Sequence, residues 1–207
     1  MQILYRDKHM LVINKPSGLL SQPGSLTDSV VHRLEKKFSF LGQVHRLDMS
    51  TSGVMVFGLS KKSQSNLSIQ FQDRTTFKVY EAIVYGALPC PKGQVNLPIR
   101  CDWPNRPRQE IHHEGKQSLT HWQLINHEEI GPKKILCSRI SLIPHTGRSH
   151  QLRIHMSAMG FPIIGDYFYA QGTALHASPR LKLHARSLHI NHPISGQRML
   201  FESNAPF

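Results

Sequence analysis

Residues 43–53 read QVHRLDMSTSG, and this stretch predicts a rigid loop at the edge of a buried strand. It places one carboxylate, Asp48, between an arginine two residues earlier and a small polar turn at residues 51–53. A hydrophobic run at residues 54–57 follows immediately. Because a loop fixed to a buried strand can hold a side chain rigidly and still expose it to a cleft, Asp48 is the first catalytic candidate.

A second charged motif, TGRSHQLR at residues 146–153, is the part of the chain that we expect to act with Asp48. Its Arg148 lies at a predicted strand-to-helix turn, a place where side chains are often displayed. A carboxylate in a cleft stays ionised when a cation or several hydrogen-bond donors lie nearby, so Arg148 is the candidate partner. The residues alone leave a structural alternative open, because a loop aspartate commonly bonds its own backbone.

The composition indicates one domain, or one core with two lobes, that binds a polyanion. The chain has 207 residues and a net charge of +12, and its pI is near 10.0. From residue 131 onward, nine Lys or Arg stand against two acidic residues. Nucleic acid is the simplest polyanion that fits such a bias. The alternative is an unspecialised basic protein.

Targeting and cysteine signals point to the cytoplasm. No window holds the roughly 18 consecutive apolar residues of a membrane span, and the N-terminus does not resemble a signal peptide. The three cysteines have no CxxC spacing, which argues against a disulfide framework or a cysteine-rich zinc site. We therefore expect a cytoplasmic protein that does not associate with membranes.

Hydrophobic periodicity predicts many strands and about three helices. Helices are expected after a cap at Thr27 or Asp28, after a cap at Ser60 through about residue 72, and over residues 148–159 with Gly160 as the stop. The fold class is α+β with a mixed, mainly antiparallel sheet. Strands are expected over residues 3–5, 9–14, 54–59, 77–85, 94–99, 118–125, 134–143, 182–190 and 198–202.

Residues 101–109, CDWPNRPRQ, combine two prolines with aromatic and basic side chains. One interpretation is an exposed loop in which Arg106 contacts phosphate and Trp103 stacks on a base. The other is an ordinary proline-rich loop with a packed tryptophan. The sequence does not separate the two.

The sequence lacks the motifs of three other kinds of site, namely metal sites, nucleotide-cofactor sites and two-metal nuclease sites. The chain has 14 histidines, but no HExxH or paired Cys/His spacing, so we expect no metal site. Neither GxxxxGK[ST] nor GxGxxG after a strand is present, which argues against a nucleotide cofactor. Asp48 has no second carboxylate nearby, which argues against a two-metal nuclease.

Five motifs stand in this order along the chain: Asn14–Gly18, His45–Asp48 followed by Thr51–Gly53, Lys78–Tyr80, His145–His155 and Leu181–Ala185. Together they resemble the motifs of the RluA-type pseudouridine synthases. Residues 101–107 narrow the resemblance to members that act on ribosomal RNA and on the anticodon arm of tRNA.

The resemblance implies a mainly antiparallel, curved sheet with a few flanking helices and a central RNA-binding cleft. It implies one catalytic domain over residues 1–207, without the separate N-terminal RNA-binding domain that many relatives carry. It also implies a reaction that needs no cofactor and no metal. We expect the partner to be ribosomal RNA, a tRNA stem-loop or both, and the enzyme to be a monomer.

The resemblance also assigns roles to residues. Asp48 would initiate cleavage of the uridine glycosidic bond, either by covalent attack or by assisting elimination, and the bond would re-form through C5. Tyr80 would stack on the base, Arg148 would pair with Asp48, and Arg46 would fill the gap left by the flipped uridine. Core packing remains an alternative for Tyr80. The substrate-binding candidates are Arg46, His45, Leu183, Thr51, Arg106 and Arg153.

Two other functions stay open. A catalytically silent RNA-binding or ribosome-assembly factor on the same fold would bind RNA and leave its uridines unchanged. The presence of Asp48, Tyr80 and Arg148 argues against it. A metal-free histidine ribonuclease, suggested only by the number of histidines, would shorten the RNA.

Overall fold

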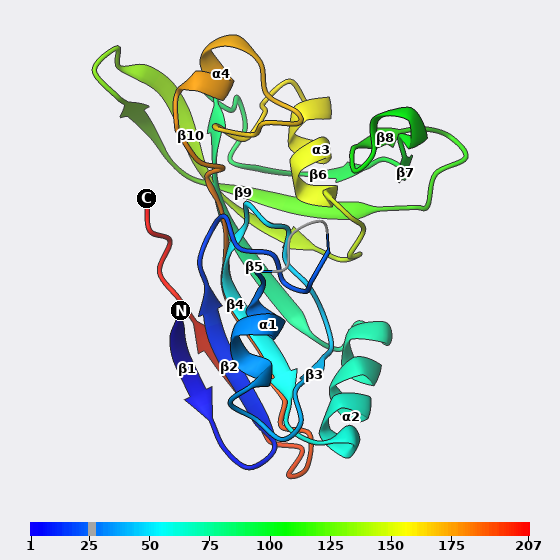
Figure 1. Cartoon of the computed structure of the whole chain (residues 1–207). Coiled ribbons are helices and arrows are strands. Elements are labelled where there is room, and N and C mark those ends of the chain that lie inside the picture. The colour runs from blue at the N-terminus through cyan, green and yellow to red at the C-terminus, as the bar shows by residue number, and fades with distance from the viewer. Residues whose placement is uncertain (25–27) are drawn as a thin grey trace. The chain divides into compact units, whose positions relative to one another are not determined.

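The computed structural model describes residues 1–24 and 28–207 (Figure 1). The described chain divides into two compact units. Unit 1 consists of Met1–Lys78 together with His184–Phe207, and unit 2 is the continuous segment Val79–Leu183. Each unit has its own hydrophobic core.

The sheet of unit 1 is built around β4 (Ser52–Gly58), which directly follows the Asp48 loop. Its antiparallel neighbour β2 (Met10–Lys15) pairs in turn with β1 (Gln2–Arg6). On its other edge β4 pairs in parallel with β11 (Leu183–Asn191), which pairs with β12 (Arg198–Glu202). The short β3 (Gly42–Gln43) also pairs with β4. All seven residues of β4 are buried, as the run of apolar residues predicts for a strand covered on both faces.

Two helices accompany this sheet (Figure 1). α2 (Lys61–Gln72) packs against β3 and β4, and its Leu67 enters the core of unit 1. The expected cap is confirmed, because the Ser60 hydroxyl accepts the Ser63 N–H at 3.2 Å. Gly58 permits the close approach of α2, since a Cβ there would lie 2.5 Å from the Gln64 nitrogen.

The first helix begins later than the sequence predicts. α1 spans Val30–Glu35, and its cap is Ser29, whose hydroxyl accepts the His32 N–H at 3.1 Å. The expected cap Asp28 is wrong, because its carboxylate instead binds the Arg33 guanidinium at 2.6 and 2.7 Å. Thr27, the other expected cap, lies outside the described residues.

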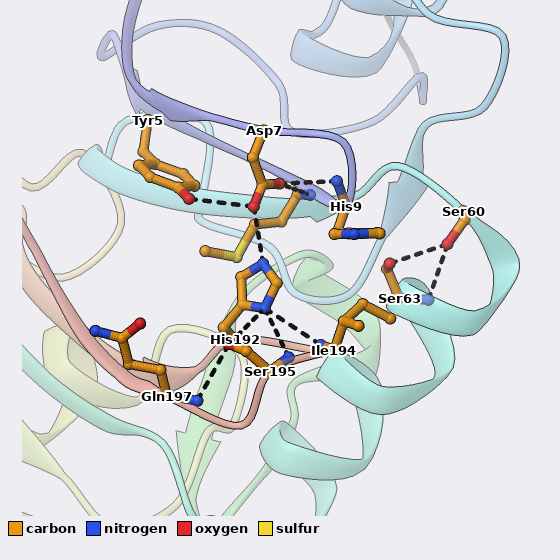
Figure 2. Close-up of polar contacts among 10 residues, drawn as sticks. Tyr5, Asp7, His9, Ser60, Ser63, His192, Ile194, Ser195 and Gln197 are labelled. Carbon is orange, nitrogen blue, oxygen red and sulfur yellow. Dashed lines mark hydrogen bonds and ion pairs between the residues drawn. The ribbon is translucent and has the colours of Figure 1, made fainter.

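The turn between β1 and β2 is organised by Asp7 (Figure 2). One oxygen of this carboxylate, Oδ1, accepts the backbone N–H groups of His9 and Met10 at 2.8 Å each. The other, Oδ2, accepts the Tyr5 hydroxyl at 3.1 Å and His192 Nε2 at 2.8 Å. Since His192 lies in the turn after β11, the carboxylate fastens two turns of unit 1 that are remote in sequence.

His192 joins the two turns through both of its ring nitrogens. Its Nδ1 accepts the Ser195 N–H at 3.0 Å, so the ring proton lies on Nε2, which donates to Asp7. Figure 2 shows the ring between the Asp7 carboxylate and the turn that contains Ser195. The imidazole therefore bridges an acceptor on one turn and a donor on the other.

Replacing Asp7 with Asn is expected to lower the free energy of unfolding by about 1–2 kcal/mol near neutral pH. Burial acts to raise the pKa of Asp7, but the donated hydrogen bonds outweigh it and lower this pKa below 3.8. A carboxyl whose pKa is lowered on folding stabilises the fold above its ordinary pKa, and this contribution is lost as the pH falls through the folded value.

Urea unfolding of both proteins between about pH 6 and about pH 3 measures this contribution. The difference between the wild type and Asp7→Asn should shrink toward the acidic end. Asp73→Asn, at an exposed carboxylate after α2, is the matched control and should show no such trend. A difference that stays constant with pH would contradict the assignment.

The sheet of unit 2 is antiparallel throughout its described pairs. β10 (Ile135–Pro144) pairs on one side with β5 (Phe77–Tyr85), of which residues 79–85 belong to this unit. On the other side it pairs with β9 (Leu119–Ile130), which also pairs with β6 (Lys92–Asn96). A separate hairpin joins β7 (Ile99–Cys101) to β8 (Gln109–Ile111). The strand expected over residues 94–99 is thus divided at Pro98, which has no N–H for a ladder bond.

α3 (Gln151–Ala158) packs against β8, β9 and β10 and buries Leu152 and Met156 in the core of unit 2. It starts three residues later than expected, because His150 before it has a positive φ of 54°. Its end at Gly160, φ +83°, is confirmed. The Gly160 N–H bonds the Ser157 carbonyl and the Phe161 N–H bonds the Met156 carbonyl, which is the Schellman arrangement.

The mixed, mainly antiparallel α+β architecture expected from the sequence is confirmed. The remaining helices are short, namely α4 (Gly172–His176) and the 3₁₀ turn Trp103–Asn105. Among the described residues, no helix combines the length and the apolarity needed to span a membrane.

Candidate active site

The backbone before Asp48 is held by a serine from an earlier loop. The Ser21 hydroxyl donates to the Leu47 carbonyl at 2.6 Å and accepts the Leu47 N–H at 3.1 Å. The backbone N–H and carbonyl of Leu47, the residue before Asp48, therefore share the Ser21 hydroxyl as their partner. The two bonds fix the direction in which the chain enters Asp48.

The backbone after Asp48 is held by a buried lysine. Lys15 is fully buried at the end of β2, and its ammonium donates to the carbonyls of Leu19 at 2.6 Å, Pro16 at 2.9 Å and Met49 at 3.1 Å. The Met49 carbonyl also accepts the Gly18 N–H at 2.9 Å. A buried charge is costly unless hydrogen bonds satisfy it, and here three carbonyl dipoles do so.

Two further bonds complete the Asp48 loop, residues 44–51. The Ser17 hydroxyl donates to the Ser50 carbonyl at 2.7 Å, and the Thr51 N–H donates to the Asp48 carbonyl at 3.1 Å. Residues 15–18, expected only as part of a family motif, therefore form the support for the candidate catalytic residue. Asp48 itself is half-buried.

The loop leads into β4, whose first two residues, Ser52 and Gly53, contact β11. The Ser52 hydroxyl donates to His184 Nδ1 at 2.8 Å, while His184 Nε2 donates to the Ser203 carbonyl at 3.0 Å. Gly53 has a φ of +120°, and a Cβ there would lie 2.3 Å from the Ala185 oxygen. Only glycine fits this junction of β4 and β11 without displacement of the backbone.

His45 is engaged within unit 1. Its Nε2 accepts the Val56 N–H at 3.0 Å, and its ring stacks on Phe71 with centroids 4.5 Å apart. Burial, with a smaller contribution from the Lys78 charge, lowers the pKa of His45 from 6.5 to about 3. The ring is therefore neutral near pH 7 and supports the loop from the side of β4 and α2.

The other two candidates of unit 1 differ in exposure. Arg46 is exposed, so its guanidinium can reach a ligand. Thr51 is buried, and its Oγ1 has no hydrogen-bond partner among the residues that the structure describes.

In unit 2 the Arg148 loop, residues 145–150, is held by Gln151. The Gln151 Oε1 accepts the Thr146 hydroxyl at 2.7 Å and the Arg148 N–H at 3.0 Å. Its Nε2 donates to the Leu119 carbonyl and to Thr120 Oγ1 on β9, both at 3.0 Å. Gln151, which the motif alone does not single out, is therefore the residue that holds this loop on β9.

The Arg148 side chain is half-buried. Within the described part of the chain, its Nε atom is buried and has no hydrogen-bond acceptor. A buried donor of a charged group without an acceptor costs free energy, so this atom can gain from an added acceptor.

A tyrosine hydroxyl joins the Arg148 loop to the β8 strand. Tyr169 Oη accepts the Gln109 N–H at 2.8 Å and shares a hydrogen bond of 2.8 Å with His150 Nδ1. His150 is the residue with positive φ that separates the loop from α3. The sequence offered no local signal for this contact, because Tyr169 lies 19 residues beyond His150.

Arg153 is committed to an internal ion pair. Its Nε donates to Asp166 Oδ2 at 2.8 Å and its Nη2 to Oδ1 at 2.6 Å, and both side chains are almost fully buried. The rings of Phe168 and Tyr169 lie 5.2 and 5.3 Å from the guanidinium carbon. Arg153 therefore lies inside the protein, where it supports the segment that contains Phe168 and Tyr169.

Three more candidates belong to unit 2. Tyr80 on β5 lies opposite Leu142 of β10 and packs, partly buried, against the core that also contains the buried Leu183. Arg106 is exposed, and its guanidinium carbon lies 4.8 Å from the ring centroid of Trp103. Since Trp103 is 67% exposed, the packed tryptophan is wrong, whereas the contacts of this loop with phosphate and base stay a prediction.

One group among the described residues brings possible metal ligands together. These are the consecutive turn residues His112, His113 and Glu114, whose ligand atoms lie within 4.8 Å of one another. The Glu114 carboxylate is bound by Arg100 at 2.6 Å, and His112 Nδ1 accepts the Glu114 N–H at 3.2 Å. Some of the atoms that could bind a metal ion are therefore already engaged in contacts within the protein.

Comparison with known proteins identifies the class. Residues 9–158 match the family model described as RNA pseudouridylate synthase, and the chain therefore belongs to this family. The enzyme class expected from the sequence, an RNA pseudouridine synthase, is thereby confirmed.

Individual proteins of this family are similar to the chain over its whole length. The dual-specificity RNA pseudouridine synthase RluA of Yersinia pestis is 48% identical over 211 aligned residues, which cover 100% of both chains. The protein of the same name from Haemophilus influenzae is 47% identical, with 100% of this chain and 94% of that protein covered. Among solved structures, human RNA Pseudouridylate Synthase Domain Containing 1 has a TM-score of 0.86 and 27% identity, covering 100% of this chain and 84% of that chain.

Proposed function

We propose that this enzyme isomerises specific uridines to pseudouridine in ribosomal RNA, in the anticodon stem-loop of tRNA, or in both. The observation that carries the proposal is the fixed backbone on both sides of Asp48, through Ser21 before it and Lys15 and Gly18 after it. Such fixation is expected of a group that must meet one reacting atom, because small displacements of a catalytic group cost large factors in rate.

In the proposed reaction, Asp48 initiates cleavage of the bond between N1 of uracil and C1′ of the ribose. The base then turns and bonds C1′ through C5. It loses the proton from C5 and gains one at N1, so substrate and product have the same composition. Covalent attack and assisted elimination are both compatible with a single carboxylate. The balance requires no oxidant, reductant or cofactor.

The target base must leave the RNA stack before the bond is accessible, which costs a few kcal/mol. We assign part of the compensation to Tyr80, since stacking of a base on an aromatic ring is worth about 1–3 kcal/mol. Arg46, exposed two residues before Asp48, would occupy the vacated place in the stack, because its guanidinium is planar.

Arg148 is the proposed partner cation of Asp48. The support is its Nε, which is buried without an acceptor among the described residues.

The contacts of the remaining candidates suggest different roles. Arg106 beside the exposed Trp103 would bind phosphate and Leu183 would form an apolar wall. Thr51 would bind substrate through its unbonded hydroxyl. His45 and Arg153 would position neighbouring segments, because their polar groups already have partners within the protein.

The test uses tRNA and ribosomal RNA fragments transcribed without modifications. They are incubated with the protein and a chelator, without added cofactor, and pseudouridine is mapped by carbodiimide treatment and primer extension. New stops at a discrete loop uridine are expected. RNA that is bound but remains unmodified would contradict the proposal, and shortened RNA would indicate a nuclease.

Replacing Tyr169 with Phe is expected to reduce the turnover number by about 10-fold, with the KM for RNA within a few-fold of the wild type. The change removes the hydroxyl that holds His150 and the Gln109 N–H, and a loss of about 1.4 kcal/mol in the transition state corresponds to that factor.

The matched control for this prediction is Tyr167→Phe. Tyr167 is 81% exposed and lies two residues away, and among the described residues its hydroxyl makes no hydrogen bond. Steady-state kinetics on one RNA substrate would compare the two variants. Equal turnover numbers for both variants and the wild type would exclude a positioning role for the Tyr169 hydroxyl.

A further inference from the structure

A hollow of about 240 Å³ opens beside the Asp48 loop, lined by Gln22, Gln43, Val44, His45 and Arg46. All five residues belong to unit 1. Sites for drug-sized molecules usually enclose about 300–1,000 Å³, so this volume suits a single planar ring system. We propose that the hollow binds an unstacked nucleobase that neighbours the target uridine, and that Gln22 distinguishes adenine there.

The lining has the chemistry of a site for base edges. Gln43 is held in place by two hydrogen bonds. Its side-chain Nε2 donates to the His45 backbone carbonyl at 3.1 Å, and its backbone carbonyl accepts Gln64 Nε2 at 3.2 Å. Gln22 is exposed, and its carboxamide makes no hydrogen bond within the described chain. This amide is therefore available to a ligand.

The charge of the lining also fits a nucleobase attached to an anionic backbone. Arg46 is the charged residue among the five that line the hollow, and no acidic residue is among them. His45 is neutral, since its Nε2 accepts the Val56 N–H. A guanidinium can stack on the face of a base while phosphates remain close to its positive charge.

The amide of Gln22 selects among bases by its paired donor and acceptor. A glutamine side chain can donate to N7 of adenine and accept from its N6 amino group at the same time. Guanine offers two acceptors at the corresponding edge, and pyrimidines have no N7. Among the edges that carry N7, only that of adenine pairs an acceptor with a donor, so a carboxamide that reads this edge distinguishes adenine.

The position of Arg46 indicates which nucleotide of the RNA enters the hollow. The inference rests on the proposed function, in which Arg46 fills the gap left by the flipped uridine. Because the same residue lines the hollow, the base that enters it is the one that stacks beside the target in the free RNA. Sequence-specific recognition of RNA usually involves such splayed bases of loops. Gln22 would then be a specificity residue.

The experiment uses the stem-loop whose uridine the mapping identifies. The nucleotide on each side of the target is in turn A, G, C or U, which gives seven different RNAs including the parent. Single-turnover conversion is measured for the wild type, for Gln22→Leu, which removes the amide at similar size, and for the control Gln72→Leu. Gln72 is exposed at the end of α2 and does not line the hollow.

The wild type should prefer adenine at one flanking position by about 10-fold or more, within the range of a two-bond amide contact. Gln22→Leu should reduce this preference below about 2-fold, while Gln72→Leu retains it. Conversion by the wild type without such a preference, or a preference that Gln22→Leu leaves intact, would overturn the inference alone. A wild type that converts no RNA would overturn the proposed function as well.

Discussion

Asp48→Asn is expected to abolish pseudouridine formation and to leave RNA affinity within a few-fold of the wild type. The neutral amide cannot act as a nucleophile or base, and the loss of an essential catalytic group typically costs about 10³-fold or more. The fold should survive, because the described bonds that hold the loop involve the backbone of Leu47, Met49 and Ser50.

The measurement is release of tritium from RNA labelled at C5 of uridine, with binding followed by gel shift. Asp73→Asn, an equally small change at an exposed carboxylate of the same unit, should convert RNA at the wild-type rate. Conversion by Asp48→Asn at a rate near that of the wild type would show that another group initiates the reaction.

Lys15→Met is expected to have the second largest effect, because it damages stability and activity together. The substitution leaves the carbonyls of Pro16, Leu19 and Met49 without the buried ammonium that binds them. The Met49 carbonyl keeps the Gly18 N–H, whereas the carbonyls of Pro16 and Leu19 lose the partner described for them. Unsatisfied buried polar groups cost about 1–3 kcal/mol each, so a loss of about 3 kcal/mol is expected. Since Met49 follows Asp48, conversion should fall under conditions in which the variant remains folded.

Urea unfolding, followed by conversion assays below the unfolding transition, separates the two effects. Lys8→Met is the matched control, because Lys8 is exposed in the turn after β1. It should behave like the wild type in both measurements. A Lys15→Met protein with wild-type stability and activity would show that the ammonium is not needed to hold the loop.

Local patterns in the sequence predicted the elements that depend on local physics. The buried strand after Asp48, the Ser60 cap of α2 and the stop at Gly160 follow from short-range periodicity, capping and glycine conformation. The errors have local causes too. Asp28 was expected as a cap, but the adjacent Ser29 takes that role while Asp28 binds Arg33.

The support of the site could not be derived from local patterns, because its bonds join residues far apart in sequence. Ser21 reaches Leu47 across 26 residues, and Lys15 reaches Met49 across 34. Ser52 reaches His184 across 132. The motifs marked these stretches as functional, but the division between residues that face a ligand and residues that hold others required the three-dimensional contacts. His45 and Arg153 are the clearest examples.

The pairing of β4 with β11 bears on the order in which the enzyme matures on the ribosome. β4 follows the Asp48 loop early in the chain, whereas β11 begins at Leu183, after the whole of unit 2. Domains of a nascent chain generally fold as units as they emerge. A chain translated through residue 183 thus contains all of unit 2 but lacks the strand beside β4. Completion of the Asp48 support must therefore wait until β11 has been synthesised.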